Sequence, residues 1–99
     1  MPLLAATTAD DKLPAIACFC VHARAEPGAM PRVLELFAKR GLVPCVWHSA
    51  IDGTDEAQLR IDIQMRGLDR DVMDYIAACM RQMPFVEVVL TSERRSITG

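Results

Sequence analysis

The sequence predicts one α+β domain in which four strands and two helices follow the order β-α-β-β-α-β. Its 99 residues suffice for one domain and are too few for two. Two segments carry apolar residues at helical spacing, and a segment between them alternates apolar and polar residues with the period of a strand. A composition of 52% hydrophobic and 24% charged residues excludes disorder, collagen and coiled coil for the whole chain.

The domain begins with an apolar strand after a small, polar segment of residues 1–14, which we expect to be a mobile tail. Residues 15–23 are nearly all apolar, and a strand places alternate side chains on opposite faces. One face then carries Phe19 and Val21, and the other carries Cys18, Cys20 and His22. Apolar side chains on both faces predict a central strand.

A helix follows the turn Glu26-Pro27-Gly28. It begins near Gly28 or Ala29, because Pro31 is tolerated only in the first turn of a helix. Gly41 supplies a left-handed residue at its end. The spacing predicts a buried stripe of Met30, Val33, Leu34 and Phe37.

The second half repeats this arrangement after a hairpin. Residues 42–52 are extended and end in the turn signal Asp52-Gly53. The following strand has a dry face of Leu59, Ile61, Ile63 and Met65, which alternate with Arg60, Asp62, Gln64 and Arg66. Asp69 is expected to cap a helix that Pro84 ends. Its predicted stripe is Val72, Ile76, Cys79, Met80 and Met83; residues 85–91 form the last strand, and residues 92–99 a C-terminal tail.

Two helices with one apolar stripe each are best packed on one face of a four-stranded antiparallel sheet, which is the ferredoxin-like arrangement. The other face stays open. We expect it to carry Arg60, Asp62, Gln64, Cys18, Cys20 and Val89. Since the first strand is apolar on both sides and helices cover only one, we expect self-association through the sheet, as a homodimer or higher oligomer.

Charge and hydropathy narrow the class of partner. The net charge of −2 gives no basic surface for nucleic acid, and no apolar run approaches the roughly 18 residues of a membrane span. The first residues lack the pattern of a signal peptide, so we expect a cytoplasmic protein. Its four cysteines are then expected to stay reduced.

Candidate chemical groups are few. Cys18, Cys20 and His22 share one strand face, with Cys45 or His48 nearby, so a zinc or copper site is conceivable; packing of small thiols at a sheet interface explains them better. The helix dipole explains the aspartates at the start of the second helix better than a metal site does. Cys79 is expected in the core, and His48 on the surface. No catalytic residue, metal site or cofactor motif is predicted.

The turn before the first helix is a candidate binding site. The free backbone N–H groups of the turn Ala25-Glu26-Pro27-Gly28, where Pro27 has none, together with those of Ala29 and Met30, suit a carboxylate such as that of an amino acid. Water or local side chains fill most such turns, which is the simpler interpretation.

Residues 26–41 resemble the Pro-Gly turn, first helix and Arg-Gly stop of ACT domains, small regulatory modules that bind amino acids. Four further stretches resemble the short small subunit of acetolactate synthase: His22-Ala23-Arg24, Arg40-Gly41-Leu42 followed by Cys45, Glu56-Ala57-Gln58, and Phe85-Val86-Glu87-Val88. This resemblance covers residues 15–91. It implies a ferredoxin-like domain that has no cofactor of its own and regulates the large catalytic subunit of a thiamin-diphosphate enzyme.

The resemblance also implies a ligand site, formed by Ala25, Glu26, Gly28, Ala29, Met30, Val43 and Pro44. Valine-sensitive members have asparagine before the turn and after the first helix, where this chain has Ala25 and Val43. We therefore expect weak valine binding. Regulation of acetolactate synthase is the leading hypothesis; the alternatives are a free-standing dimeric ACT-type sensor of amino acids or other small molecules, and a metal-handling domain that uses Cys18 and Cys20.

Overall fold

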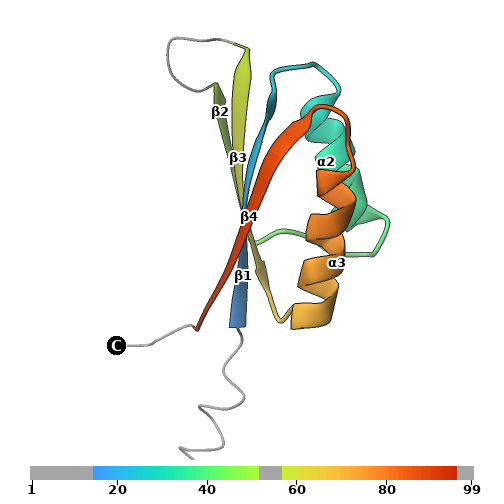
Figure 1. Cartoon of the computed structure of the whole chain (residues 1–99). Helices are drawn as coiled ribbons and strands as arrows, with labels where there is room; N and C mark the ends of the chain where they lie inside the picture. Colours follow the sequence, from blue (N-terminus) through green and yellow to red (C-terminus); the bar gives the residue numbers. More distant parts are fainter. Residues whose placement is uncertain (1–14, 52–56, 96–99) are drawn as a thin grey trace, which may run out of the picture.

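The computed structural model describes residues 15–51 and 57–95, which form the predicted β-α-β-β-α-β order (Figure 1). The four strands make one antiparallel sheet in the order β2-β3-β1-β4, with both helices on one face. The predicted ferredoxin-like fold is thus confirmed. The tail of residues 1–14 and the Asp52-Gly53 turn lie outside the described residues. The elements are β1 (Ala15–Arg24), α2 (Ala29–Ala38), β2 (Val46–Ile51), β3 (Gln58–Arg66), α3 (Arg70–Arg81) and β4 (Val86–Arg95).

The core lies between the sheet and the helices. β1 and β3 pair in register so that Phe19 stands beside Ile63, and Val21 beside Ile61. All four side chains are buried, and Phe19 packs edge to face on Phe37 of α2 with 5.7 Å between ring centroids. The predicted dry face of β3, from Leu59 to Met65, is confirmed.

Helix α2 begins after Gly28 and is followed by Gly41 at φ +70°, both as predicted. The predicted stripe is half wrong, because Met30 and Leu34 are 40% and 43% exposed. The buried residues are Ala29, Val33 and Phe37. This stripe, spaced by four residues, puts the small Ala29 against the sheet and turns the two longer side chains toward the flank of the helix.

Helix α3 ends at Arg81, ahead of Pro84. Its buried residues are Met73, Ile76, Ala77 and Met80, whereas Val72, Cys79 and Met83 are only partly buried. Cys79 therefore lies at the margin of the core, contrary to prediction. Asp69 occupies the N-cap position, but its side chain makes no capping hydrogen bond. Neither described helix is long and apolar enough to cross a membrane.

Two predictions for the last strand are wrong. Val89 was expected on the open face, yet it is buried in the core, and β4 continues to Arg95 instead of ending at residue 91. The pairing with β1 shifts between His22, opposite Val88, and Ala23, opposite Val86. This bulge inserts Glu87 as an extra residue, so the alternation of side chains changes phase beyond it.

Candidate functional site

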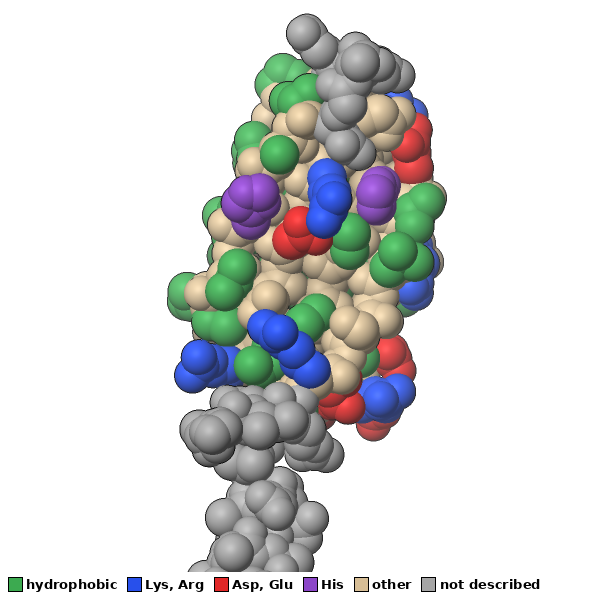
Figure 2. All heavy atoms as spheres, turned by 90° about the vertical axis from the view of Figure 1, so that its left-hand side faces the viewer, with side chains coloured by type: hydrophobic (Ala, Val, Ile, Leu, Met, Phe, Trp, Pro, Cys, Tyr) green, Lys and Arg blue, Asp and Glu red, His purple; other side chains and the backbone are tan. Residues whose placement is uncertain are grey.

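The face of the sheet opposite the helices is not covered by any described element (Figure 1). We call this the open face. Figure 2 shows it as a mixed surface, in which two histidines flank a basic and an acidic side chain among apolar groups. By strand register, its residues are Val46, His48 and Ala50 of β2, Gln58, Arg60, Asp62, Gln64 and Arg66 of β3, Ile16, Cys18, Cys20, His22 and Arg24 of β1, and Val88, Leu90, Ser92 and Arg94 of β4.

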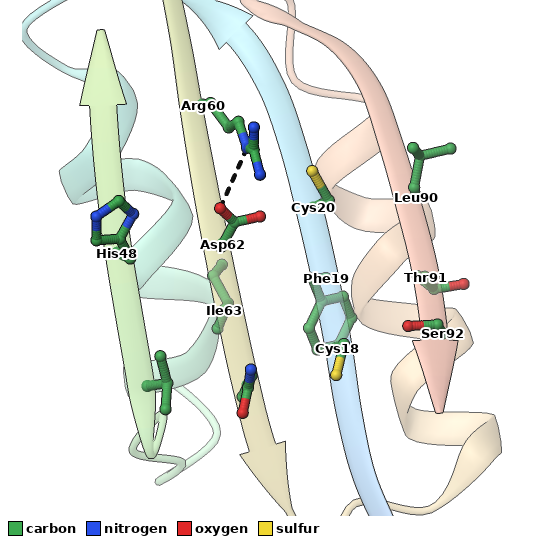
Figure 3. Close-up of a pocket in the computed structure, with 12 residues that line it drawn as sticks. Cys18, Phe19, Cys20, His48, Arg60, Asp62, Ile63, Leu90, Thr91 and Ser92 are labelled. Carbon is green, nitrogen blue, oxygen red and sulfur yellow. Dashed lines mark hydrogen bonds and ion pairs between the residues drawn. The ribbon is translucent and has the colours of Figure 1, made fainter. Parts of the chain in front are cut away.

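A shallow hollow of about 560 Å³ lies along this face (Figure 3). Val46 of β2 and Leu90 of β4 line its two sides, and Arg60 and Asp62 of β3 line its middle. Cys18 and Cys20 of β1 lie between the charged strand and Leu90. The hollow thus combines apolar walls with one pair of opposite charges.

Arg60 and Asp62 form an ion pair two residues apart on β3, with 3.2 Å between Nε and Oδ2. Their side chains are 51% and 35% exposed. An exposed pair of this kind contributes about 0 to 1 kcal/mol to folding because water screens it. Two adjacent opposite charges therefore remain on the open face at little cost or benefit to the fold.

Cys20 is a poor nucleophile and a poor metal ligand in this setting. Burial raises the pKa of its thiol above the usual value, and the Asp62 carboxylate raises it further, against the smaller effect of Arg60. Its Sγ lies 3.5 Å from Nε2 of His22. Within residues 15–51 and 57–95, no three His, Cys, Asp or Glu side chains are grouped to hold a metal ion. The geometry gives the metal-handling alternative no support.

The turn before α2 is the second candidate site, and local bonds already use part of it. The N–H of Ala25 donates to Ala57 O, that of Glu26 to Arg24 O, and that of Ala29 to Glu26 O. In the described part of the chain, the N–H groups of Gly28 and Met30 have no acceptor. Beside the turn lies an apolar hollow of about 240 Å³, lined by Ala25, Glu26, Pro27, Met30, Ile51 and Leu59.

The remaining two residues of the expected ligand site, Val43 and Pro44, lie beyond the other end of α2. The ten residues of this helix separate the two parts by about 15 Å. Val43 is 84% exposed and Pro44 partly buried. The structure therefore brings together five of the expected residues at one end of the helix and two at the other.

Solved structures with low sequence identity share this architecture. The ACT domain of GTP pyrophosphokinase from Chlorobium tepidum superposes with a TM-score of 0.66 at 10% identity, covering 80% of this chain and 99% of that one. The chain has an ACT-like fold. The regulatory subunit of aspartate kinase from Thermus flavus gives a TM-score of 0.56 at 13% identity, with 84% of this chain and 52% of that chain covered.

Proteins of several kinds share this fold. The C-terminal domain of the MgtC protein from Mycobacterium tuberculosis gives a TM-score of 0.64 at 14% identity over 87% of this chain and 93% of that domain. No family model and no curated protein matches the sequence. Similarities of this size show a common fold, and function must be argued from the surface residues.

Sequence reasoning found part of the open face of this ACT-like domain and missed the rest. It placed Cys18, Cys20, Arg60, Asp62 and Gln64 there correctly. It missed Val88 and Leu90, since the bulge that turns them outward has no signal in a run of apolar residues. It also missed the apolar hollow beside the turn, because no sequence pattern indicates that Ile51 lies close to Met30.

Proposed function

We propose that this chain is a non-catalytic regulatory subunit whose partner is the large catalytic subunit of acetolactate synthase, in branched-chain amino-acid biosynthesis. The observation that carries the proposal is the ACT-like fold, with the Pro27-Gly28 turn at the entrance to α2. The resemblance of residues 26–41 and of four further stretches to the short small subunit of that enzyme supports this choice of partner.

An aliphatic amino acid is the ligand class that the turn suits. The two free N–H groups of Gly28 and Met30 are donors for a carboxylate at a helix N-terminus. The apolar hollow beside them suits an aliphatic side chain. Gly28 has an ordinary φ of −85° and no heavy atom within 4 Å of a Cβ added there, so the backbone is open to a ligand.

The chemistry of the ammonium group argues for weak valine binding. The side chains of Ala25 and Val43 offer no acceptor, and Val43 is far from the turn within one chain. The Glu26 carboxylate beside the hollow is already paired with Arg24, with 3.0 Å between Oε2 and Nε. Each buried N–H donor left unpaired costs about 1 to 3 kcal/mol, or about 5- to 150-fold in affinity. Calorimetry with valine, leucine and isoleucine should therefore show weak or no binding to the wild type, a gain in Ala25→Asn, which adds an acceptor beside the turn, and no gain in Val43→Asn alone. Micromolar binding of valine by the wild type would refute this argument.

Reconstitution with the catalytic subunit tests the proposed function. Purified chain is added to the purified large subunit of acetolactate synthase from the same organism, and acetolactate formation from pyruvate is measured. We expect a complex, a higher rate than that of the large subunit alone, and no activity of the chain alone. The complex should respond little to valine, for the reason given above.

A folded chain that neither binds the large subunit nor changes its rate would contradict the proposal. In that case the free-standing sensor is the better hypothesis. A pull-down from native lysate followed by mass spectrometry separates the two, because only the regulatory subunit should bring down the catalytic subunit of acetolactate synthase. Gly28→Ala separates ligand binding from folding. The added methyl group fits the fold, but it lies in front of the N–H groups of the turn.

A further inference from the structure

We infer that the open face is a contact between two copies of this chain, stacked face to face about a twofold axis that crosses the strands between Arg60 and Asp62. This contact concerns two identical chains, so it does not depend on the identity of any catalytic partner. The composition of the open face, its row-by-row register and its area support this contact.

The composition of the open face fits a protein contact better than water. Val46, Val88 and Leu90 are exposed there at 42%, 43% and 57%, and the half-buried thiols of Cys18 and Cys20 lie between them. Apolar groups therefore run across all the strands except β3. These groups lie on both sides of the Arg60–Asp62 ion pair, and Arg66 and Arg94 lie at one end of the face. Apolar groups with polar and charged groups around them are typical of interaction surfaces.

The register arranges the centre of the open face in two adjacent rows that match each other. From β2 to β4, the first row is His48, Asp62, Cys20 and Leu90. In the same order, the second row is Ala50, Arg60, His22 and Val88. A twofold axis between the rows, parallel to them, places the first row of one copy over the second row of the other. A contact of this symmetry must be self-complementary.

These two rows meet that requirement at both charged and apolar positions. Arg60 of each copy lies over Asp62 of the other, which gives a ring of four alternating charges. Leu90 of each copy lies over Val88 of the other. Opposite charges that are buried on association need partners of this kind, and such pairs fix the register of a contact.

A twofold axis along the strands fits less well. If it ran between β3 and β1, it would place Asp62 over Cys20 and Arg60 over His22 of the second copy. The carboxylate would then face a thiol whose pKa is already raised by that carboxylate, and the guanidinium would face an imidazole. Both charges would be buried without an opposite charge from the other copy, which is unfavourable.

The area of the open face fits a weak, reversible dimer. From the lengths of the four strands and their usual spacing of about 4.8 Å, the sheet offers about 550 Å² per copy. The axis between Arg60 and Asp62 lies off the middle of β1 and β4, so a stack about it overlaps about 400 Å² per copy and buries about 800 Å² in total, at the low end of specific interfaces. Sheets stacked in this way cross at about 30° because each is twisted.

Charge reversal at the two central residues tests the stack, with mass measured by light scattering and sedimentation equilibrium. The wild type should be a dimer. Arg60→Asp places two carboxylates together across the contact, and Asp62→Arg places two guanidinium groups together, so each variant alone should raise the dimer dissociation constant at least about 100-fold. Mixed together, the two variants should form a heterodimer, because every central pair is again of opposite charge. The double variant Arg60→Asp, Asp62→Arg should be a homodimer.

The matched controls are Glu35→Lys and Lys39→Glu, which reverse the exposed ion pair on α2 without touching the open face. They should leave the mass unchanged. Circular dichroism shows whether each variant is folded. If a variant with a single reversal does not fold, the double variant tests the contact in its place. A monomeric wild type, dimers that persist in both single variants, or a failure of the mixed variants to pair would each overturn the inference.

Discussion

The two faces of the sheet are made by the same four strands and face opposite environments. On the helix side, Phe19, Val21 and Ile61 are each at most 1% exposed. On the other side, their neighbours in sequence, Cys20 and Arg60, stand in a shallow hollow. In the described part of the chain, no buried side-chain nitrogen or oxygen lacks a partner. Hence the helix face holds the core of the fold, and the open face contributes little to it.

The largest effect expected from this comparison is the loss of an aromatic ring from the helix face. Phe37→Ala removes a fully buried ring in edge-to-face contact with Phe19 and should lower the free energy of unfolding by about 3 to 5 kcal/mol. Urea denaturation measures this. Phe37→Leu keeps most of the apolar surface and serves if the alanine variant does not fold.

Leu34→Ala is the matched control on the same helix. Its side chain is exposed on the flank of α2, so the free energy of unfolding should change by less than about 1 kcal/mol. Similar losses for Phe37→Ala and Leu34→Ala would show that the assignment of the buried stripe of α2 is wrong.

Adjacent valines on β4 give a finer comparison of the two faces. Val89 is buried in the core and Val88 is exposed on the open face. Val89→Ala should cost about 2 kcal/mol, whereas Val88→Ala should stay within about 0.5 kcal/mol for the isolated chain. Denaturation at several protein concentrations separates the contribution of association. Equal costs for the two valines would contradict the bulge at Glu87.

This valine pair marks where prediction from sequence ends. The alternation from Leu59 to Met65 determines both faces of β3, because every second residue is polar. In β4, Val86, Val88 and Val89 are all apolar, so composition alone does not tell which of them face inward. The bulge that decides this depends on the pairing with β1, which is a long-range contact.

The helices and the candidate site show the same limit: features that depend on long-range packing could not be predicted from the sequence. The start of α2 was predictable from Pro31, but its rotation depends on Ala29 packing on the sheet, and apolar spacing gives little weight to alanine. The residues of the turn were predictable as a group, since they are contiguous. The separation of Val43 from that turn was not, because it depends on the direction of α2 and the path of the chain after it.

The smallest effect is the pH dependence that Cys20 contributes. Its pKa is raised in the folded state, so the unfolded chain ionises first as the pH increases. The stabilising contribution is complete below the pKa of the unfolded thiol, near 8.5, and is lost as the pH rises through the folded value. The free energy of unfolding should therefore fall as the pH rises above about 8.5, and it should fall less in Cys20→Ala.

Ser92→Ala is the control for this titration, because it removes a side chain without an ionisable group from the same hollow. It should keep the wild-type slope of stability against pH. A slope that stays at the wild-type value in Cys20→Ala would show that this thiol does not cause the pH dependence.

Photochemical cross-linking from Leu90 tests the role of the open face most directly. Leu90 is replaced by the photoreactive p-benzoylphenylalanine, ¹⁴N and ¹⁵N chains are mixed before irradiation, and linked peptides are identified by mass spectrometry. We predict links between isotopically different chains, from position 90 to the segment around Val88. The same replacement at the exposed Ile51, on the edge strand β2, should give far fewer links between chains. Links between chains from position 51 and none from position 90 would contradict the assignment of the open face as the contact surface.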